Sequence, residues 1–267
     1  MTLNESIGNG ILVSIPHSGV HCPVEIDHNL LSDNIQELSI NNVDWFTNLL
    51  YDFSDLLGNK QIIFPINQIY INVNRHPDYI DECVPTEIDG LLIYKAGSKP
   101  SIEVRKRLLA KYHSGYHNAI ASVNKLFILD GHSTVTGFRD ASGEIVQDDI
   151  ILSDFQNSNL DPLPGIKTAP DGFLESYANA LTKLLPHLRI SLNTTYCSTY
   201  GHIMSEHGWN GIGERKNKTP LILQETNEDI YIHNRVPDIK AIEELRRSFS
   251  ESLIVMLNKT QKFYEYK

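Results

Sequence analysis

Cysteine is scarce in this chain. Cys22, Cys83 and Cys197 are widely spaced along the 267 residues, and none belongs to a Cys-x-x-Cys pair. An odd number of distant cysteines argues against a disulfide framework and against a zinc site built from thiolates. The same scarcity favours a reducing compartment, so we expect a cytoplasmic protein.

Clustered positive charge and long apolar runs are also lacking. The formal net charge is −10, and the 33 acidic and 23 basic residues are interspersed. The short basic group at 105–107 is too small for the basic face of a nucleic-acid-binding protein. The first apolar run, residues 11–15, is too short for a signal sequence or a membrane span. We therefore expect neither nucleic-acid nor membrane partners.

The composition suits one α/β domain or two small ones, and we expect a single domain spanning residues 1–267. Hydrophobic residues make up 41% of the chain, which is enough for a substantial core. The sequence contains no internal repeat, no low-complexity tract and no clear interdomain linker. Residues 134–172 are loop-rich, and a loop of this length is uncommon unless it is functional, for example as a lid over a site.

Two apolar runs stop abruptly at a histidine. Residues 126–129 are followed by Asp130-Gly131-His132-Ser133, and residues 10–15 by Pro16-His17. Such runs are typical of buried strands, and in open α/β sheets ligands bind where strands give way to loops. If extended geometry continues through Gly131, Asp130 shares a side with His132 and can fix the tautomer of its imidazole. Solvated loop residues after a core strand are the alternative.

Other predicted strands also end in polar residues. Residues 69–73 are followed by Asn74 and Arg75, and residues 221–224 by Glu225. The planar guanidinium of Arg75 suits bidentate capture of a carboxylate, although a surface salt bridge is the commoner role of an arginine. Further strands are predicted at 61–64 and 188–193. The helical spacing of apolar residues predicts helices at 35–57, 101–125, 173–185 and 237–263.

Two predicted helices carry candidate functional residues. Asp44 lies on the polar stripe of the 35–57 segment, or in the first turn of a shorter helix, where a carboxylate is favoured. It is either functional or part of a solvated face. His113 and His117 are four residues apart, a spacing that suits a helical metal pair. The glutamate of the His-Glu-x-x-His signature is missing, which favours packing or substrate contact for both.

The residues at the strand ends suggest hydrolytic chemistry. Two histidines, His17 and His132, together with a carboxylate are suitable ligands for a catalytic zinc ion. Such an ion lowers the pKa of water and polarises a carbonyl. Glu225 would transfer the proton of the water to a leaving nitrogen, and Arg75 would anchor an anionic substrate. The prediction is metal-assisted hydrolysis of an amide bond in a small molecule that bears a carboxylate.

Six motifs, in order, resemble those of the N-formylglutamate amidohydrolase family. They are Pro16-His17-Ser18-Gly19, Val43-Asp44-Trp45, Asn72-Val73-Asn74-Arg75-His76-Pro77, Tyr116-His117, Leu129-Asp130-Gly131-His132-Ser133 and Gln224-Glu225-Thr226-Asn227. The resemblance runs from about residue 11 to about residue 235. The family is distantly similar to zinc carboxypeptidases, which implies a three-layer α/β fold with a mixed central sheet flanked by helices.

The resemblance also implies roles for individual residues. It makes His17 and His132 ligands of Zn²⁺ or of another divalent transition metal. The carboxypeptidase pattern has a glutamate three residues after its first histidine, but Val20 stands there in this chain. We therefore take Asp44, from the Asp-Trp motif, as third ligand in preference to Glu25. The remaining implied roles are general base for Glu225 and substrate binding for Asn74, Arg75, Arg139 and His117.

The predicted function is metal-dependent cleavage of the amide bond of an N-acyl amino acid such as N-formylglutamate. A zinc carboxypeptidase or a peptidoglycan-type amidase would use the same ligands. A non-catalytic protein that binds small carboxylates through Arg75 would have no need of a proton-transferring Glu225. Serine chemistry at Ser18 or Ser133 is disfavoured because neither serine lies in a Gly-x-Ser-x-Gly elbow.

Overall fold

The fold is organised around a mixed β-sheet. The computed structural model describes residues 8–135, 145, 147–154, 167–194, 201–209 and 219–260. Within these ranges six strands form the sheet in the order β2-β1-β5-β8-β6-β7. The strands are β1 (Ile11–Ile15), β2 (Lys60–Ile63), β5 (Phe127–Thr134), β6 (Ile150–Ser153), β7 (Ile190–Leu192) and β8 (Leu221–Asn227). Only β6 and β8 pair antiparallel among the neighbouring strands of this sheet.

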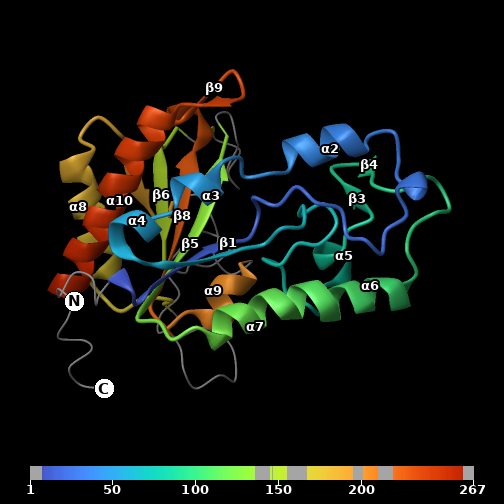
Figure 1. Ribbon diagram of the computed structural model, residues 1–267, viewed down its shortest axis with the longest axis horizontal. Helices are drawn as coiled ribbons and strands as arrows, with labels where there is room; N and C mark the ends of the chain where they lie inside the picture. The colour runs from blue at the N-terminus through green and yellow to red at the C-terminus, as the bar shows by residue number, and fades with distance from the viewer. Residues whose placement is uncertain are drawn as a thin grey trace.

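Helices cover both faces of the sheet and make three layers (Figure 1). Because side chains alternate along a strand, Val13 of β1 packs into one core and Leu12 into the other. The first core is closed by α8 (Phe173–Leu184) and α10 (Ile239–Lys259), and the second by α7 (Ser114–Ser122) and α9 (His202–His207). The predicted mixed α/β fold is confirmed.

Shorter elements lie beside the sheet and join its strands (Figure 1). The helical ones are η1 (His28–Leu30), α2 (Ile35–Asn41), α3 (Thr47–Leu50), α4 (Ser54–Leu57), α5 (Ile80–Cys83), α6 (Ile102–Leu108), the π-helical turn η2 (Leu109–His113) and η4 (Glu228–Ile230). Two small hairpins are formed by β3 (Glu87–Ile88) with β4 (Leu91–Leu92), and by β9 (Ile232–His233) with β10 (Val236–Pro237). Among the described residues, no helix has the length and apolar character needed to cross a membrane.

Most predicted elements are confirmed, with shifts at their ends. The helix expected at 101–125 begins at the cap Ser101, where the side chain accepts a hydrogen bond from the Val104 amide, and it includes the π-helical turn η2. Those expected at 173–185 and 237–263 correspond to α8 and α10, although residues 261–263 lie outside the described residues. Helix α9 lies in a region for which no helix was predicted.

The single helix predicted at 35–57 is wrong. Three short helices, α2, α3 and α4, replace it. Phe46 adopts a left-handed conformation with φ 61°, which an α-helix does not tolerate, so the chain turns between α2 and α3. Asp44 lies in that turn instead of on a helical face. Gly58 ends α4 in a left-handed conformation with φ 68°.

The strand predicted at 69–73 is also wrong. Asn67 starts a turn in which its side chain accepts a hydrogen bond from the Ile69 amide and its carbonyl accepts one from Tyr70. The apolar side chains of Ile69, Ile71 and Val73 are nevertheless buried in the second core. The alternating apolar pattern therefore predicted correctly which side chains are buried, although this segment does not form a β-strand.

Strands β5 and β8 run further than their apolar segments. Both continue through polar residues, and their register pairs His132 with Glu225 and Thr134 with Asn227. The hydroxyl of Tyr51 donates to the carbonyl oxygens of His132 (2.9 Å) and Gln224 (3.2 Å), which stabilises this end of the ladder. A side chain at Gly131 would meet the Tyr51 ring at 2.7 Å, so glycine is needed there for the close approach.

Candidate active site

Three predicted ligands lie together at the carboxyl ends of two neighbouring strands. His17 follows β1, His132 lies in β5, and Asp44 lies in the turn between α2 and α3. Each offers a ligand atom, and these atoms are within 4.8 Å of one another. Because β1 and β5 are parallel and adjacent, their ends bring the two histidines to one place.

The contacts within this group centre on the Asp44 carboxylate. Its Oδ2 lies 3.3 Å from His132 Nδ1 and 3.7 Å from His17 Nδ1, and the two imidazole rings are 4.9 Å apart in an edge-to-face arrangement. The Ser133 amide donates to the same oxygen (3.2 Å). The Asp44 amide donates to the His17 carbonyl (3.1 Å), which fixes the turn against the end of β1.

Second partners orient the two imidazoles. Asp130 is fully buried, and its Oδ2 lies 3.2 Å from His132 Nε2, while its Oδ1 accepts a hydrogen bond from Ser14 Oγ (2.8 Å). His17 Nε2 lies 3.1 Å from the side-chain oxygen of Asn72. Both rings therefore hold Nε2 on an oxygen acceptor and present Nδ1 toward Asp44. Holding the far nitrogen in this way is a common feature of metal-binding histidines.

The charges of this group depend on one another. Burial raises the pKa of Asp44, but hydrogen bonds from His132 and His17 outweigh it and hold the pKa well below its usual range. Burial lowers the pKa of His132, but the charge and hydrogen bond of Asp130 and the hydrogen bond of Asp44 raise it well above its usual value. Without an ion, the raised pKa of His132 favours its protonated form beside the ionised Asp44 carboxylate. A divalent cation has to displace that proton in order to bind.

Glu225 lies beside His132 on the adjacent strand and is 7% exposed. Burial raises the pKa of Glu225 to about 8; the positive charge of His132 opposes this rise, while the charges of Asp44 and Asp130 add to it. A carboxyl group with a pKa near neutrality, next to a candidate metal group, has the properties of a proton-transfer residue.

Two residues of this site were not expected from the sequence. Glu228 of η4 accepts hydrogen bonds from Ser133 Oγ (2.8 Å) and from the Trp45 amide (3.1 Å), and burial raises its pKa to about 7. Its signal was its position three residues after Glu225. Asn72 lies two residues before Asn74 in the Asn-Val-Asn-Arg run, and this position was the signal for it.

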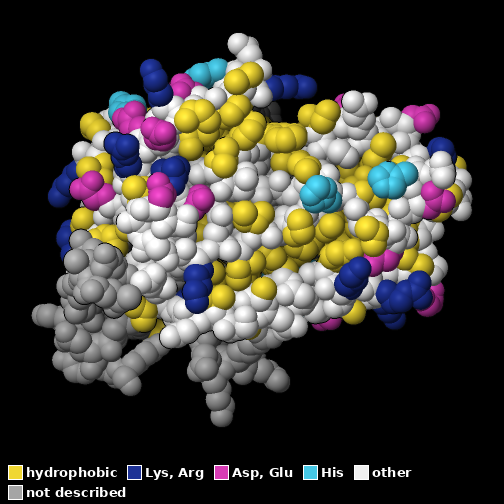
Figure 2. Space-filling view, viewed as in Figure 1, with side chains coloured by type: hydrophobic (Ala, Val, Ile, Leu, Met, Phe, Trp, Pro, Cys, Tyr) yellow, Lys and Arg dark blue, Asp and Glu magenta, His cyan; other side chains and the backbone are white. Residues whose placement is uncertain are grey.

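A cavity of about 530 Å³ borders this site. Val43 and Trp45, the neighbours of Asp44, line it together with Glu228, Arg235 and several apolar side chains. Figure 2 shows apolar side chains gathered on the surface between β9 and α2, where this cavity opens. The site therefore has adjoining space for a small molecule.

Two other predicted substrate residues, Asn74 and Arg75, are linked to His17 through Asn72, whose side-chain oxygen contacts His17 Nε2 (3.1 Å) and accepts a hydrogen bond from the Asn74 amide (2.9 Å). Asn74 is buried, and its side-chain oxygen accepts a hydrogen bond from the Ile203 amide (3.1 Å) at the start of α9. The Arg75 side chain is 37% exposed, lies 3.7 Å from Glu82 and donates to the Asn74 carbonyl (3.2 Å). Their role in gripping a substrate carboxylate stays a prediction.

Glu25, the alternative third ligand, faces elsewhere. Its carboxylate accepts hydrogen bonds from Lys111 (2.6 Å) and from the Tyr112 hydroxyl (2.8 Å). His117 lies in a different group of histidines, together with His113 and His202. Arg139 lies outside the described residues, as does most of the loop-rich 134–172 segment.

The protein has an α/β fold with a mixed sheet. Buried histidine and carboxylate side chains lie together at the ends of its strands and form a candidate metal site. Residues 9–232 match the N-formylglutamate amidohydrolase family, and the chain belongs to that family. This confirms the resemblance seen in the motifs.

The chain is similar to characterised relatives over part of its length. It is 29% identical to the N-formylglutamate deformylase of Pseudomonas aeruginosa over 123 residues, which cover 42% of this chain and 44% of that protein. It is 28% identical to the N-formylglutamate deformylase of Pseudomonas putida over 118 residues, 41% of this chain and 43% of that protein. Each match spans less than half of the curated relative.

Similarity to solved structures extends over nearly the whole chain. The crystal structure of an N-formylglutamate amidohydrolase from Ralstonia eutropha superposes with a TM-score of 0.71 and 15% identity, covering 95% of this chain and 94% of that one. A gene product of Agrobacterium tumefaciens gives a TM-score of 0.62 and 13% identity, over 98% and 94% of the two chains. At these identities the similarity establishes the fold.

Proposed function

We propose that this protein is a metal-dependent amidohydrolase that hydrolyses N-acyl amino acids, with N-formylglutamate as the leading substrate. The observation that carries the proposal is the buried group of His17, Asp44 and His132, next to the raised-pKa carboxyl of Glu225. Membership of the N-formylglutamate amidohydrolase family supports the same chemistry.

The donor set fits a divalent transition metal. Two imidazole nitrogens and one carboxylate oxygen are typical ligands of a catalytic zinc ion that keeps one position open. Asp130 and Asn72 hold the far nitrogens of the two rings, so that both imidazoles present the same nitrogen to Asp44. When bound, such an ion would polarise the scissile carbonyl and lower the pKa of a water molecule. Zn²⁺ is the leading candidate, and another divalent transition metal has the same ligand preferences.

The chain's own residues would then move the proton. Glu225, once ionised, accepts a proton from the attacking water, and the water oxygen forms a bond to the acyl carbon. The C–N bond breaks as Glu225 returns the proton to the leaving nitrogen. With N-formylglutamate as substrate, the products are formate and glutamate. A bound cation nearby favours the ionised form of Glu225, because an opposite charge lowers the pKa of a carboxyl group.

Substrate binding is assigned to the residues predicted from the sequence. Arg75 and Asn74 would hold the α-carboxylate, and Arg139 would contact the rest of the molecule. His117 was predicted to contact substrate as well, but its two ring nitrogens are paired with Val73 and His207, so we leave it out of the substrate site. The guanidinium of Arg75 is partly exposed and its carboxylate neighbour, Glu82, is itself half exposed, so a substrate carboxylate can compete for it.

The test is a substrate panel with the metal-loaded protein. N-formyl-L-glutamate, N-acetyl-L-glutamate, other N-formyl amino acids and short peptides would be compared by release of the free amine. We expect N-formyl-L-glutamate to have the highest kcat/KM and turnover to stop when the metal is chelated. Hydrolysis of peptides without hydrolysis of any N-acyl amino acid would replace this proposal with the carboxypeptidase or amidase alternative.

A further inference from the structure

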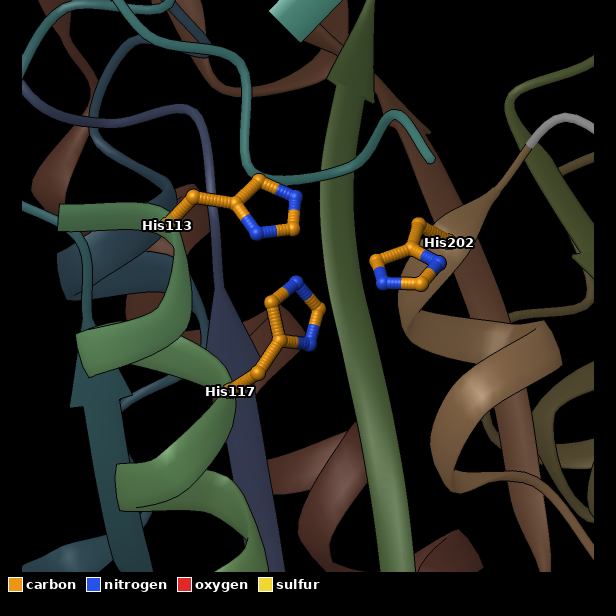
Figure 3. A group of neighbouring side chains, drawn as sticks. All are labelled: His113, His117 and His202. Atoms are coloured by element: carbon orange, nitrogen blue, oxygen red, sulfur yellow. The ribbon is translucent and has the colours of Figure 1, made fainter. Parts of the chain in front are cut away.

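A second cluster of titratable side chains shares no residue with the group of His17, Asp44 and His132. It consists of five of the chain's 11 histidines, namely His76, His113, His117, His202 and His207. The ring centroids of neighbouring pairs are 4.6 to 5.3 Å apart. Figure 3 shows the rings of His113, His117 and His202 facing a common space, with ring nitrogens of His113 and His117 turned toward each other.

Three of these histidines have the spacing of a metal site. His113, His117 and His202 each offer a ring nitrogen within 4.8 Å of the others, and they are 3%, 5% and 8% exposed. Around a tetrahedral ion with Zn–N bonds of about 2.0–2.1 Å, ligand nitrogens stand roughly 3.3 Å apart. The rings therefore need to close in by no more than about 1.5 Å, which is within reach of small side-chain rotations.

Two of the three ligands come from one helical segment. His113 ends the π-helical turn η2 and His117 follows one turn later in α7, so both point to the same side. The third, His202, begins α9 and approaches from a distant part of the chain. Single π-helical turns within α-helices are frequent at functional sites.

Hydrogen bonds leave nitrogen lone pairs for an ion. His113 Nε2 lies 2.9 Å from the Arg75 carbonyl and must donate to it, so its Nδ1 is a free acceptor. His202 Nδ1 is buried and has no hydrogen-bond partner. Figure 3 shows the other ring nitrogen of His202, Nε2, on the side of His113 and His117, so Nε2 is the nitrogen that would hold the ion.

His117 is hydrogen-bonded at both ring nitrogens. Its Nε2 lies 2.8 Å from the Val73 carbonyl, and its Nδ1 lies 2.9 Å from His207 Nε2. A carbonyl oxygen only accepts, so without an ion Nε2 donates to Val73 and Nδ1 accepts from His207. To bind an ion, Nε2 has to give up the bond to Val73, and the ring proton moves to Nδ1, which then donates to His207. His207 thus takes the supporting position that a carboxylate or carbonyl often holds behind a metal-bound histidine.

The electrostatics keep these ligands neutral. Burial first, and then the mutual repulsion of the neighbouring rings, holds the pKa of His117 well below its usual value and lowers the pKa of His202 to about 3. The pKa of His113 is lowered by burial as well. An all-imidazole site suits Zn²⁺, Co²⁺, Ni²⁺ or Cu²⁺, whereas Ca²⁺ and Mg²⁺ require oxygen ligands.

The cluster is connected to the segment predicted to bind substrate. The Asn74 carbonyl accepts a hydrogen bond from the His202 amide (3.2 Å), and the carbonyls of Arg75 and Val73 pair with His113 and His117. We propose that His113, His117 and His202 bind a second divalent transition-metal ion, separate from the His17 group, which clamps residues 73–76 between α7 and α9. This holds whether or not the proposed hydrolytic function is correct.

The test counts bound ions on the full chain after chelation and reloading with Zn²⁺ or Co²⁺. Wild-type protein should bind two equivalents, and a His17→Gln variant should retain one. Adding His113→Gln or His202→Gln to that variant should remove the remaining equivalent, together with the visible Co²⁺ absorption of a four-coordinate site. Circular dichroism would verify that each variant is folded.

The matched control is His76→Gln, which changes a histidine that touches the His202 ring but is not one of the three ligands. In the His17→Gln background, this control should still bind one equivalent. An ion that persists after both His113→Gln and His202→Gln would overturn the proposal. If those variants do not fold, the His17→Gln protein decides alone: one bound ion supports the second site, and none overturns it.

Discussion

The His17 group and the His113 group contain the same residue type in opposite electrostatic states. His132 lies between two carboxylates, Asp44 and Asp130, and its pKa is raised well above its usual value. His117 is just as buried, but other imidazoles surround it, and its pKa is lowered. Burial alone does not decide the charge of a histidine, because the charges of its neighbours do.

This difference suggests different roles. The His17 group combines two imidazoles with an anionic ligand and has Glu225 and a cavity of about 530 Å³ nearby, as a catalytic site requires. The ligands of the His113 group are all neutral, and that group lies between α7, α9 and the 73–76 segment. We expect the first group to perform chemistry and the second to stabilise the protein around its ion.

The largest expected effect follows from replacing Glu225 in the first group. Glu225→Gln keeps the shape of the side chain and removes proton transfer, so kcat should fall by about 10²–10⁴-fold. Metal content should not change, because Glu225 is not one of the three ligands. Glu251→Gln on the exposed face of α10 is the matched control. Unchanged turnover in Glu225→Gln would remove its assigned role.

A second variant removes the anionic ligand of the His17 group, so that the group resembles the His113 group. Asp44→Asn removes the anionic ligand, and we expect affinity for Zn²⁺ to fall by about 100-fold or more, since loss even of groups behind the ligands costs 10–100-fold. The pKa of His132 should fall as well, because the Asp44 hydrogen bond helps to raise it. Calorimetric metal titration and histidine NMR would measure the two effects. Wild-type metal affinity in Asp44→Asn would exclude it as a ligand.

The pH dependence of stability should have opposite signs in the two groups. A raised pKa in the folded state means that stability is lost as pH rises. For Glu225 this loss runs from about pH 4.5 to about 8, and for His132 it begins at about pH 6.5. The lowered pKa of His117 and of His202 means that their contribution is lost as pH falls below about 6.5.

Thermal unfolding of the metal-free protein from pH 5 to 9 measures both limbs of this dependence. Glu225→Gln should remove the loss of stability that Glu225 causes between about pH 5 and 8, and His202→Gln should weaken the loss of stability below about pH 6.5. If both variants follow the wild-type profile at every pH, these groups do not govern the stability of the protein.

The smallest expected effect concerns the alternative third ligand. Glu25→Gln weakens a surface contact with Lys111 and Tyr112, so Tm and metal content should stay close to those of the wild type. Metal analysis beside Asp44→Asn gives a direct comparison of the two carboxylates. A lost equivalent of metal in Glu25→Gln would reverse the choice between them.

Much of the fold was predictable because it depends on local apolar patterns. The runs at 10–15 and 221–224 became strands of the sheet, and the 173–185 segment became α8, since each buries one contiguous apolar surface. The errors at 35–57 and 69–73 share one cause. Helical and alternating spacing report which side chains are buried, but they do not report where the backbone turns between them.

The amino-acid sequence by itself determined the strands that carry His17 and His132, the family, and the candidate general base, because these depend on short motifs at the ends of apolar runs. Only the tertiary structure decided that Asp44 meets those histidines, through the left-handed turn at Phe46. It alone brought His202 to His113 and His117, because packing of α9 against α7 unites residues that are about 85 positions apart in the chain, beyond the reach of any local pattern.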